Sequence, residues 1–197
     1  MSYEVTEEQE QLRDMLRELF EEAARPRDSF DGGQALDREV WTRLVELGLV
    51  GIFVPEEHGG SGGSVFDQTL VAEEVGAFDV AVPVVTSSVA ALLLTRLGTE
   101  AALAALQAVI GGDAVVLAAV SAARGVDLPV TAVEADGGWL LSGSVDDLLE
   151  GACASRLVVP ADAGSDRAWF LVDLAAPGVD LFDQPSLDPT IASSSTE

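Results

Sequence analysis

Apolar residues in the first 112 positions recur at intervals of three and four, which is the spacing of a helix with one buried face. Polar residues that can cap a helix precede these runs, and proline or glycine follows them. Thr6 and Gln9 have the spacing of a capping box, in which each side chain bonds a free amide at the helix start. The pattern predicts five helices, which follow Thr6, Asp37 and Ser64, cover about Ser87–Leu97, and follow Thr99.

After Asp113 the pattern changes to short runs rich in β-branched and aromatic residues, separated by Gly, Pro and Asp. Six such runs predict strands: AVVLAAV, LPVTAVEA, GWLLSG, SRLVVPA, AWFLVDL and VDLFDQ. Helices followed by strands, without alternation, indicate an α+β fold with an all-helical N-terminal domain and a small β-barrel or sandwich. We expect a helical domain over 1–112, a β-domain over 113–190 and an unstructured tail over 191–197.

The composition excludes several classes of partner. Thirty-four acidic residues against ten basic ones, all arginine, give a formal net charge of −24. Such a surface repels nucleic acid and anionic membranes, so we expect neither as a partner. The single cysteine, Cys153, cannot form an internal disulfide, which fits a reducing cytoplasm. A cytoplasmic location is also expected because the N-terminus has no signal-peptide pattern and no apolar run reaches the roughly 18 residues of a membrane span.

The segment PEEHGGSGG, residues 55–63, permits three interpretations. Gly59, Ser61 and Gly63 fit the G-x-S-x-G elbow of serine hydrolases, but the only histidine, His58, lies too close along the loop to act as the base. A phosphate-binding loop of the P-loop type needs a lysine, and the chain has none. We therefore expect a glycine-shaped turn between the second and third helices, with His58 as an exposed loop residue.

The flanks of this turn carry a resemblance to a known family. Residues 41–77, WTRLVELGLVGIFVPEEHGGSGGSVFDQTLVAEEVGA, resemble the N-terminal domain of acyl-CoA dehydrogenases, where W-x-x-L-x-E-L-G-L leads to P-E-x-x-G-G-x-G and then to a helix with V-x-E-E-x-G. LLLTRLGTEA resembles a later part of that helical domain, and GWLLSG, FLVDLAAPGVDL and SLDPT resemble the family's middle β-domain. The matches keep the family's order over residues 6–190.

The resemblance implies an FAD enzyme that introduces a double bond between Cα and Cβ of an acyl-CoA thioester. In the family a glutamate removes the α-proton while flavin N5 accepts the β-hydride, and that glutamate comes from a C-terminal helical domain. We expect this chain to stop at the end of the β-domain and to lack the C-terminal helical domain. The resemblance therefore assigns no catalytic residue and no metal ligand here, and it implies a chain that is inactive alone.

Two segments are expected to face the flavin by this resemblance. The family's T-E-P or S-E-P turn corresponds to VSAARG, which gives Val120 and Ser121 as contacts; Ser121 can equally bond its own backbone at a strand end. The family's G-x-K-x-W-I-T segment corresponds to GSVDDLLEG, which gives Leu148 and Leu149 as contacts. Asp147 stands there in place of the aromatic residue, and its charge is costly to bury unless it is paired.

Charge sets a further condition on cofactor binding. Residues 113–197 hold fourteen acidic residues and three arginines, a balance of −11, so we expect a partner chain to supply cations for the phosphates of FAD and CoA. Glu73 and Glu74 of the V-x-E-E-x-G element are interpreted as surface charges. Cys153 is interpreted as a small buried hydrophobic residue because no basic neighbour would lower its pKa.

Two functions stay open from the sequence. The first is an acyl-CoA dehydrogenase subunit whose chemistry is completed by a companion subunit, by a second copy or by a missing C-terminal half. The second is a non-catalytic binding or scaffold subunit, or a truncated remnant of the same family. An acidic helical interaction protein unrelated to flavin would not predict matches in the family's order.

Overall fold

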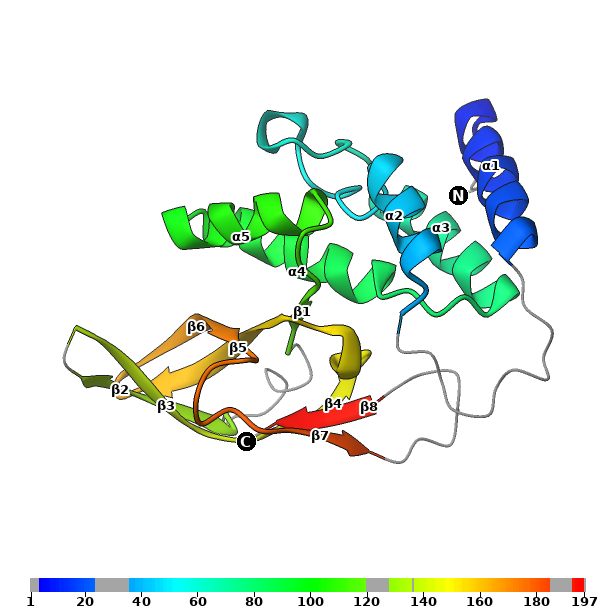
Figure 1. Cartoon of the computed structure of the whole chain (residues 1–197). Helices are drawn as coiled ribbons and strands as arrows, with labels where there is room; N and C mark the ends of the chain where they lie inside the picture. The colour runs from blue at the N-terminus through cyan, green and yellow to red at the C-terminus, as the bar shows by residue number, and fades with distance from the viewer. Residues whose placement is uncertain (1–3, 24–35, 120–127, 136, 185–192, 197) are drawn as a thin grey trace.

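The computed structural model describes residues 4–23, 36–119, 128–135, 137–184 and 193–196. Within these ranges the chain forms helices first and strands afterwards, and Figure 1 shows the helices gathered on one side of the strands. This segregation confirms the α+β class. The α-helices are α1 (Glu7–Ala23), α2 (Arg38–Glu46), α3 (Val65–Phe78), α4 (Val84–Leu97) and α5 (Glu100–Ile110).

Side-chain oxygens begin most of these helices, as the sequence predicts. The Thr6 amide donates to Gln9 Oε1 at 3.0 Å, and the Gln9 amide donates to Thr6 Oγ1 at 3.3 Å. The side chains of Asp37, Ser64 and Thr99 accept amide hydrogen bonds at the starts of α2, α3 and α5. These bonds satisfy amides that have no partner inside the helix, so local chemistry fixes where each helix begins.

Helix α4 begins at Val84, earlier than the predicted start near Ser87. Ser87 resembles a cap in the sequence, but it lies inside the helix and is buried together with Ser88. The Ser88 hydroxyl donates to the carbonyl of Val50 at 3.1 Å. Two small residues on the buried surface of α4 let neighbouring segments approach closely, and this packing role outweighs the preference of serine for helix starts.

The strands form two sheets. The larger sheet has five strands. Four of them follow the order β1-β5-β2-β3, and β6 also pairs with β5. The smaller sheet has the order β4-β8-β7. β1 runs parallel to β5, whereas β5–β6, β2–β3, β4–β8 and β7–β8 are antiparallel. The strands are β1 (Val116–Ala118), β2 (Val130–Ala135), β3 (Gly138–Gly143), β4 (Val145–Leu149), β5 (Arg156–Ala163), β6 (Asp166–Asp173), β7 (Leu181–Gln184) and β8 (Ser193–Thr196).

Two of these strands, β4 and β8, are not predicted by the sequence pattern. The expectation of an unstructured tail is wrong for Ser193–Thr196, which form the central strand of the smaller sheet. The sequence SSST has no apolar alternation, but backbone hydrogen bonds to β4 on one side and β7 on the other hold it. In β4 a bulge between Val145 and Leu148 interrupts the alternation of side chains.

One apolar core runs through both parts of the chain. It includes Leu16 and Phe20 of α1, Leu94 of α4, Val116 of β1 and Leu157 of β5. Figure 1 shows α4 lying between the other helices and the strands, and α4 packs directly against α3, α5 and β1. The helical part and the sheets are therefore held in a fixed arrangement by shared burial of apolar surface.

A polar contact adds to this junction. Glu150 follows β4, and its carboxylate accepts a hydrogen bond from the Thr86 hydroxyl in the first turn of α4. Glu150 itself has a left-handed backbone conformation with φ +62°. Burial raises the pKa of the Glu150 carboxyl above its ordinary value of 4.5, because the charged form is poorly solvated there, and the Thr86 bond opposes this only in part.

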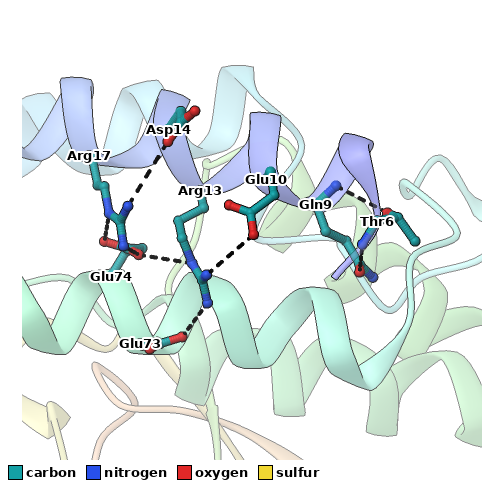
Figure 2. Close-up of polar contacts among 8 residues, drawn as sticks. All are labelled: Thr6, Gln9, Glu10, Arg13, Asp14, Arg17, Glu73 and Glu74. Carbon is teal, nitrogen blue, oxygen red and sulfur yellow. Dashed lines mark hydrogen bonds and ion pairs between the residues drawn. The ribbon is translucent and has the colours of Figure 1, made fainter. Parts of the chain in front are cut away.

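Helix α1 is held to α3 by a cluster of charged side chains, shown in Figure 2. Glu74 is only 2% exposed, so the interpretation of this residue as a surface charge is wrong. Arg17 contacts the Glu74 carboxylate through two nitrogens, Nη2 to Oε1 at 3.0 Å and Nε to Oε2 at 3.1 Å. Arg13 Nε lies 3.3 Å from the same Oε1. Glu73, with a side chain 59% exposed, pairs with Arg13 at 2.8 Å. Glu74 is therefore the carboxylate on which the cluster centres.

Removing the charge of Glu74 should destabilise the fold far more than removing the charge of Glu73. We expect Glu74→Gln to lower the free energy of unfolding by about 3 kcal/mol, because two arginines lose a buried counter-charge. Glu73→Gln should cost less than about 1 kcal/mol, because the Glu73 side chain is 59% exposed and water screens its pair with Arg13. Urea denaturation of both variants measures this difference, and equal losses would contradict the role of Glu74.

The raised pKa of Glu150 predicts a pH-dependent difference between the wild type and Glu150→Gln. The folded state binds the Glu150 proton more tightly than the unfolded state, so this group's stabilisation is complete below its unfolded pKa of 4.5 and is lost as pH rises through the folded pKa. Glu150→Gln keeps an acceptor for Thr86 and never carries a charge. Its Tm should exceed that of the wild type at about pH 8 and match it at about pH 4.5.

Asp146→Asn serves as the control for this comparison, because Asp146 is an exposed carboxylate on the same strand, β4. A pH-dependent gain in Tm of the same size in both variants would mean that the loss of any negative charge suffices. The burial of Glu150 would then not be the cause.

Candidate functional site

The glycine-rich segment at residues 55–63 is a packed turn between α2 and α3. Residues 47–60 form turns and a short 3₁₀ helix, so no strand leads into Ser61, whose hydroxyl donates to the carbonyl of Gly48 at 2.9 Å. A Cβ on Gly60 would lie 2.2 Å from the backbone oxygen of Val54, which explains the need for glycine at this close approach. The predicted turn is confirmed, and the geometry of a hydrolase elbow is not formed.

His58 differs from the expectation of an exposed residue. It ends the 3₁₀ helix Glu56–His58 and is half-buried. Its carbonyl accepts a hydrogen bond from Gln107 Nε2 of α5 at 2.8 Å, which ties the turn to α5. The backbone of His58 thus has a structural role.

The flavin-facing residues expected from the resemblance fall into two groups. Val120 and Ser121 lie outside the described residues. Leu148 and Leu149 are consecutive in β4, and the alternation of a strand sends them to opposite sides. Leu148 is 4% exposed and belongs to the core, whereas Leu149 is 50% exposed. Of the two, only Leu149 offers its side chain at the surface.

The rest of β4 is polar at the position where the family carries an aromatic residue. Asp147 is exposed and has a left-handed backbone conformation with φ +56°, at the bulge between Val145 and Leu148. Its carboxylate is hydrated in this chain, so the burial cost expected from the sequence arises only if a ring covers it. The strand therefore presents one apolar side chain, Leu149, beside two carboxylates, those of Asp146 and Asp147.

These residues fit only part of an FAD molecule. The exposed Leu149 could contact the edge of an apolar ring, but β4 carries no cation for the pyrophosphate. Arg167 on β6 already pairs with Asp162 on β5, at 3.4 Å. The described residues of β4 thus offer an apolar contact for a ring and no cation for the phosphates.

Cys153 lies shortly after β4 and has an unreactive thiol. It ends the short 3₁₀ helix Gly151–Cys153, is half-buried, and its Sγ donates to the Glu150 carbonyl at 3.0 Å. Burial, together with the negative charge of Glu150, raises the pKa of the thiol to about 12. A thiol of this kind stays protonated at neutral pH, which excludes a role as a nucleophile.

In the described part of the chain, no group of three or more His, Cys, Asp or Glu side chains could hold a metal ion. The described helices also include none that is long and apolar enough to cross a membrane.

Comparison with known proteins shows what this architecture is similar to. The family model of the acyl-CoA dehydrogenase N-terminal domain matches residues 6–110. Acyl-CoA dehydrogenase FadE27 of Mycobacterium tuberculosis is 34% identical over 152 residues, which cover 74% of this chain and 39% of FadE27. Acyl-CoA dehydrogenase FadE34 of the same organism is 33% identical over 182 residues, covering 87% of this chain and 23% of FadE34.

Solved structures show the same relationship in three dimensions. The ChsE4–ChsE5 complex from Mycobacterium tuberculosis superposes on all of this chain with a TM-score of 0.86 and 28% identity, covering 55% of the matched chain. Butyryl-CoA dehydrogenase from Megasphaera elsdenii, 22% identical with a TM-score of 0.79, shares the fold. The chain spans about half the length of these structures and less of the two curated relatives. Because the family match extends over more than half of its residues, the chain belongs to the acyl-CoA dehydrogenase family.

Proposed function

We propose that this chain forms the helical and β parts of an FAD-dependent acyl-CoA dehydrogenase subunit. The observation that carries the proposal is the superposition of the whole chain on 55% of a subunit of the ChsE4–ChsE5 complex, at 28% identity. The reaction would be the family's: a base removes the α-proton of an acyl-CoA thioester, and the flavin accepts the β-hydride. In this chain Val120, Ser121 and the exposed side chain of Leu149 would lie along the flavin, with Leu148 packed in the core behind the strand.

The proposal includes a partner, because the described residues match only part of FAD. Residues 113–197 have a charge balance of −11, and β4 adds carboxylates where the ring would lie. A companion acyl-CoA dehydrogenase subunit would supply the catalytic base and the cations for the phosphates of FAD and CoA. That one matched structure is named as a complex of two different chains supports a companion over a second copy. We place the assembly in the cytoplasm, since the lone thiol suits a reducing compartment.

We propose a CoA thioester as the substrate and no particular acyl group. Matched relatives are named benzylmalonyl-CoA dehydrogenase and isobutyryl-CoA dehydrogenase, and these acyl groups differ widely in size and polarity. The family relationship therefore supports the reaction type without selecting an acyl group.

A second candidate function is a non-catalytic subunit that only binds a dehydrogenase. The exposed pair Asp146 and Asp147 favours it, because a strand that lies against a flavin ring gains nothing from two hydrated carboxylates. In this case the helical part would serve as a docking scaffold. The chain would then never hold FAD in any assembly.

Flavin retention separates the two candidates. The purified full chain, mixed with FAD and passed through gel filtration, should elute without the visible flavin band, because no cation of β4 anchors the phosphates. Co-expressed with a companion acyl-CoA dehydrogenase subunit, it should co-elute in a complex that carries more flavin per companion subunit than the companion carries alone. A flavin content equal to that of the companion alone would contradict the catalytic proposal, and a flavin band on the chain alone would contradict the need for a partner.

Two leucines provide a matched pair for the contact itself. Leu149→Asp should weaken FAD binding by the complex roughly tenfold, because it replaces an exposed apolar contact with a charge. Leu140→Asp places the same charge at a leucine of β3 that is also exposed, and it should leave FAD binding unchanged. Flavin fluorescence titration measures both. An equal effect of the two substitutions would show that β4 does not contact the cofactor.

A further inference from the structure

The turn that ends β4 packs between the smaller sheet and the start of α4. It consists of Glu150 and the short 3₁₀ helix Gly151–Cys153. A Cβ on Gly151 would lie 2.7 Å from Cβ of Ser194 in β8, so the turn has no spare room on that side. On the other side, Glu150 Oε2 is hydrogen-bonded to the Thr86 hydroxyl in the first turn of α4. The Glu150 side chain is thus a polar link between the end of β4 and α4.

Glu150 holds a backbone conformation that residues with a side chain seldom adopt. Its φ of +62° lies in the left-handed region, where such a residue stays only when its surroundings hold it. One restraint is its carbonyl, which accepts hydrogen bonds from the Cys153 amide at 3.1 Å and from Cys153 Sγ at 3.0 Å. The side-chain bond to Thr86 is the other. Loss of that bond would let the turn relax toward an ordinary backbone conformation.

The number of hydrogens at Thr86 makes this link depend on the charge of Glu150. Thr86 Oγ1 lies 3.1 Å from the carbonyl oxygen of Pro83 and also contacts Glu150 Oε2, but a hydroxyl carries a single hydrogen. A protonated Glu150 donates to Thr86, whose own hydrogen then bonds Pro83, so both contacts are hydrogen bonds. An ionised Glu150 leaves two acceptors for one hydrogen, and one contact becomes two facing oxygens. The three oxygens are therefore matched to a protonated carboxyl.

Among the described residues, no charged group compensates an ionised Glu150. Burial raises the pKa of its carboxyl and the Thr86 bond opposes this, without a contribution from a charged residue. The titratable groups nearest the turn on the elements around it are Asp146 and Asp147 of β4, Asp183 of β7, Cys153 itself and Arg38 of α2, which acts on the Cys153 thiol. The described residues of β8 and the first three turns of α4 carry no charged side chain.

We infer that the turn Glu150–Cys153 is a proton-operated switch, which holds the end of β4 against α4 while Glu150 carries a proton and opens when the carboxyl ionises. The proton passes to solvent, and no covalent bond other than the O–H bond changes. In the open state the Cys153 thiol, which is half-buried and bonded to the Glu150 carbonyl, becomes accessible. Leu149, the residue before the turn, loses its fixed position at the same time. The inference goes beyond the proposed function and holds whether or not β4 contacts a flavin.

The single thiol of the full chain measures this opening. The test compares, at one pH at a time, how fast the uncharged reagent N-ethylmaleimide alkylates Cys153 in the wild type and in Glu150→Gln, whose amide carries no charge and always has a hydrogen for Thr86. We expect similar rates at about pH 5 and a wild-type rate at least about fivefold higher at about pH 8. Asp146→Asn, which removes an exposed charge of β4, should react like the wild type at both pH values.

A turn that stays closed predicts the opposite sign. The negative charge of Glu150 raises the pKa of the Cys153 thiol, so without opening the wild type would react more slowly than Glu150→Gln at about pH 8. That result, or equal rates at this pH, would overturn the inference. A labelling rate that rises with urea as steeply as global unfolding would also overturn it, because local opening exposes little surface.

A second variant decides if Glu150→Gln does not fold. Thr86→Val keeps the shape of the side chain and removes the hydroxyl that holds Glu150. At about pH 5 it should therefore be alkylated at least about fivefold faster than the wild type, whose turn is then closed. An equal rate in the two proteins at this pH would overturn the inference.

Discussion

Helix α4 packs against both the other helices and the sheets, and this packing joins the two parts of the chain. This helix contacts α3 and α5 on the helical side and β1 on the side of the sheets. Small buried residues allow the close approach on all these sides: Ser87, Ser88, Ala90 and Ala91 are fully buried, with Leu94 beside them. Because α4 is buried between the other helices and the sheets, its packing also fixes where β4 and Glu150 lie relative to the helices.

Features that depend on neighbouring residues could be predicted from the sequence, whereas features that depend on distant segments could not. Helix starts depend on one side chain and the amides beside it, so Thr6, Asp37, Ser64 and Thr99 are found at the predicted positions. The strand β8 and the burial of Glu74 depend on distant partners instead. SSST becomes a strand only between β4 and β7, and Glu74 is buried only because α1 brings Arg13 and Arg17 over it.

The candidate site could be located but not described from the sequence. Family likeness selects β4 as a flavin-facing strand, and GSVDDLLEG carries no signal of its own for a bulge. The bulge and the left-handed Asp147 leave two consecutive carboxylates exposed, those of Asp146 and Asp147, and ordinary strand alternation then separates Leu148 from Leu149.

Negative charge is the property that separates this chain from a self-sufficient flavin enzyme. The chain belongs to the acyl-CoA dehydrogenase family, yet β4 carries two exposed carboxylates and no cation. We therefore expect another polypeptide to complete the chemistry. Acyl-CoA oxidation, followed with an electron-accepting dye in the presence of FAD, is the measurement to make. We expect no turnover by the chain alone, and more turnover by the chain with a companion subunit than by the companion alone; turnover by the chain alone would show that no partner is needed.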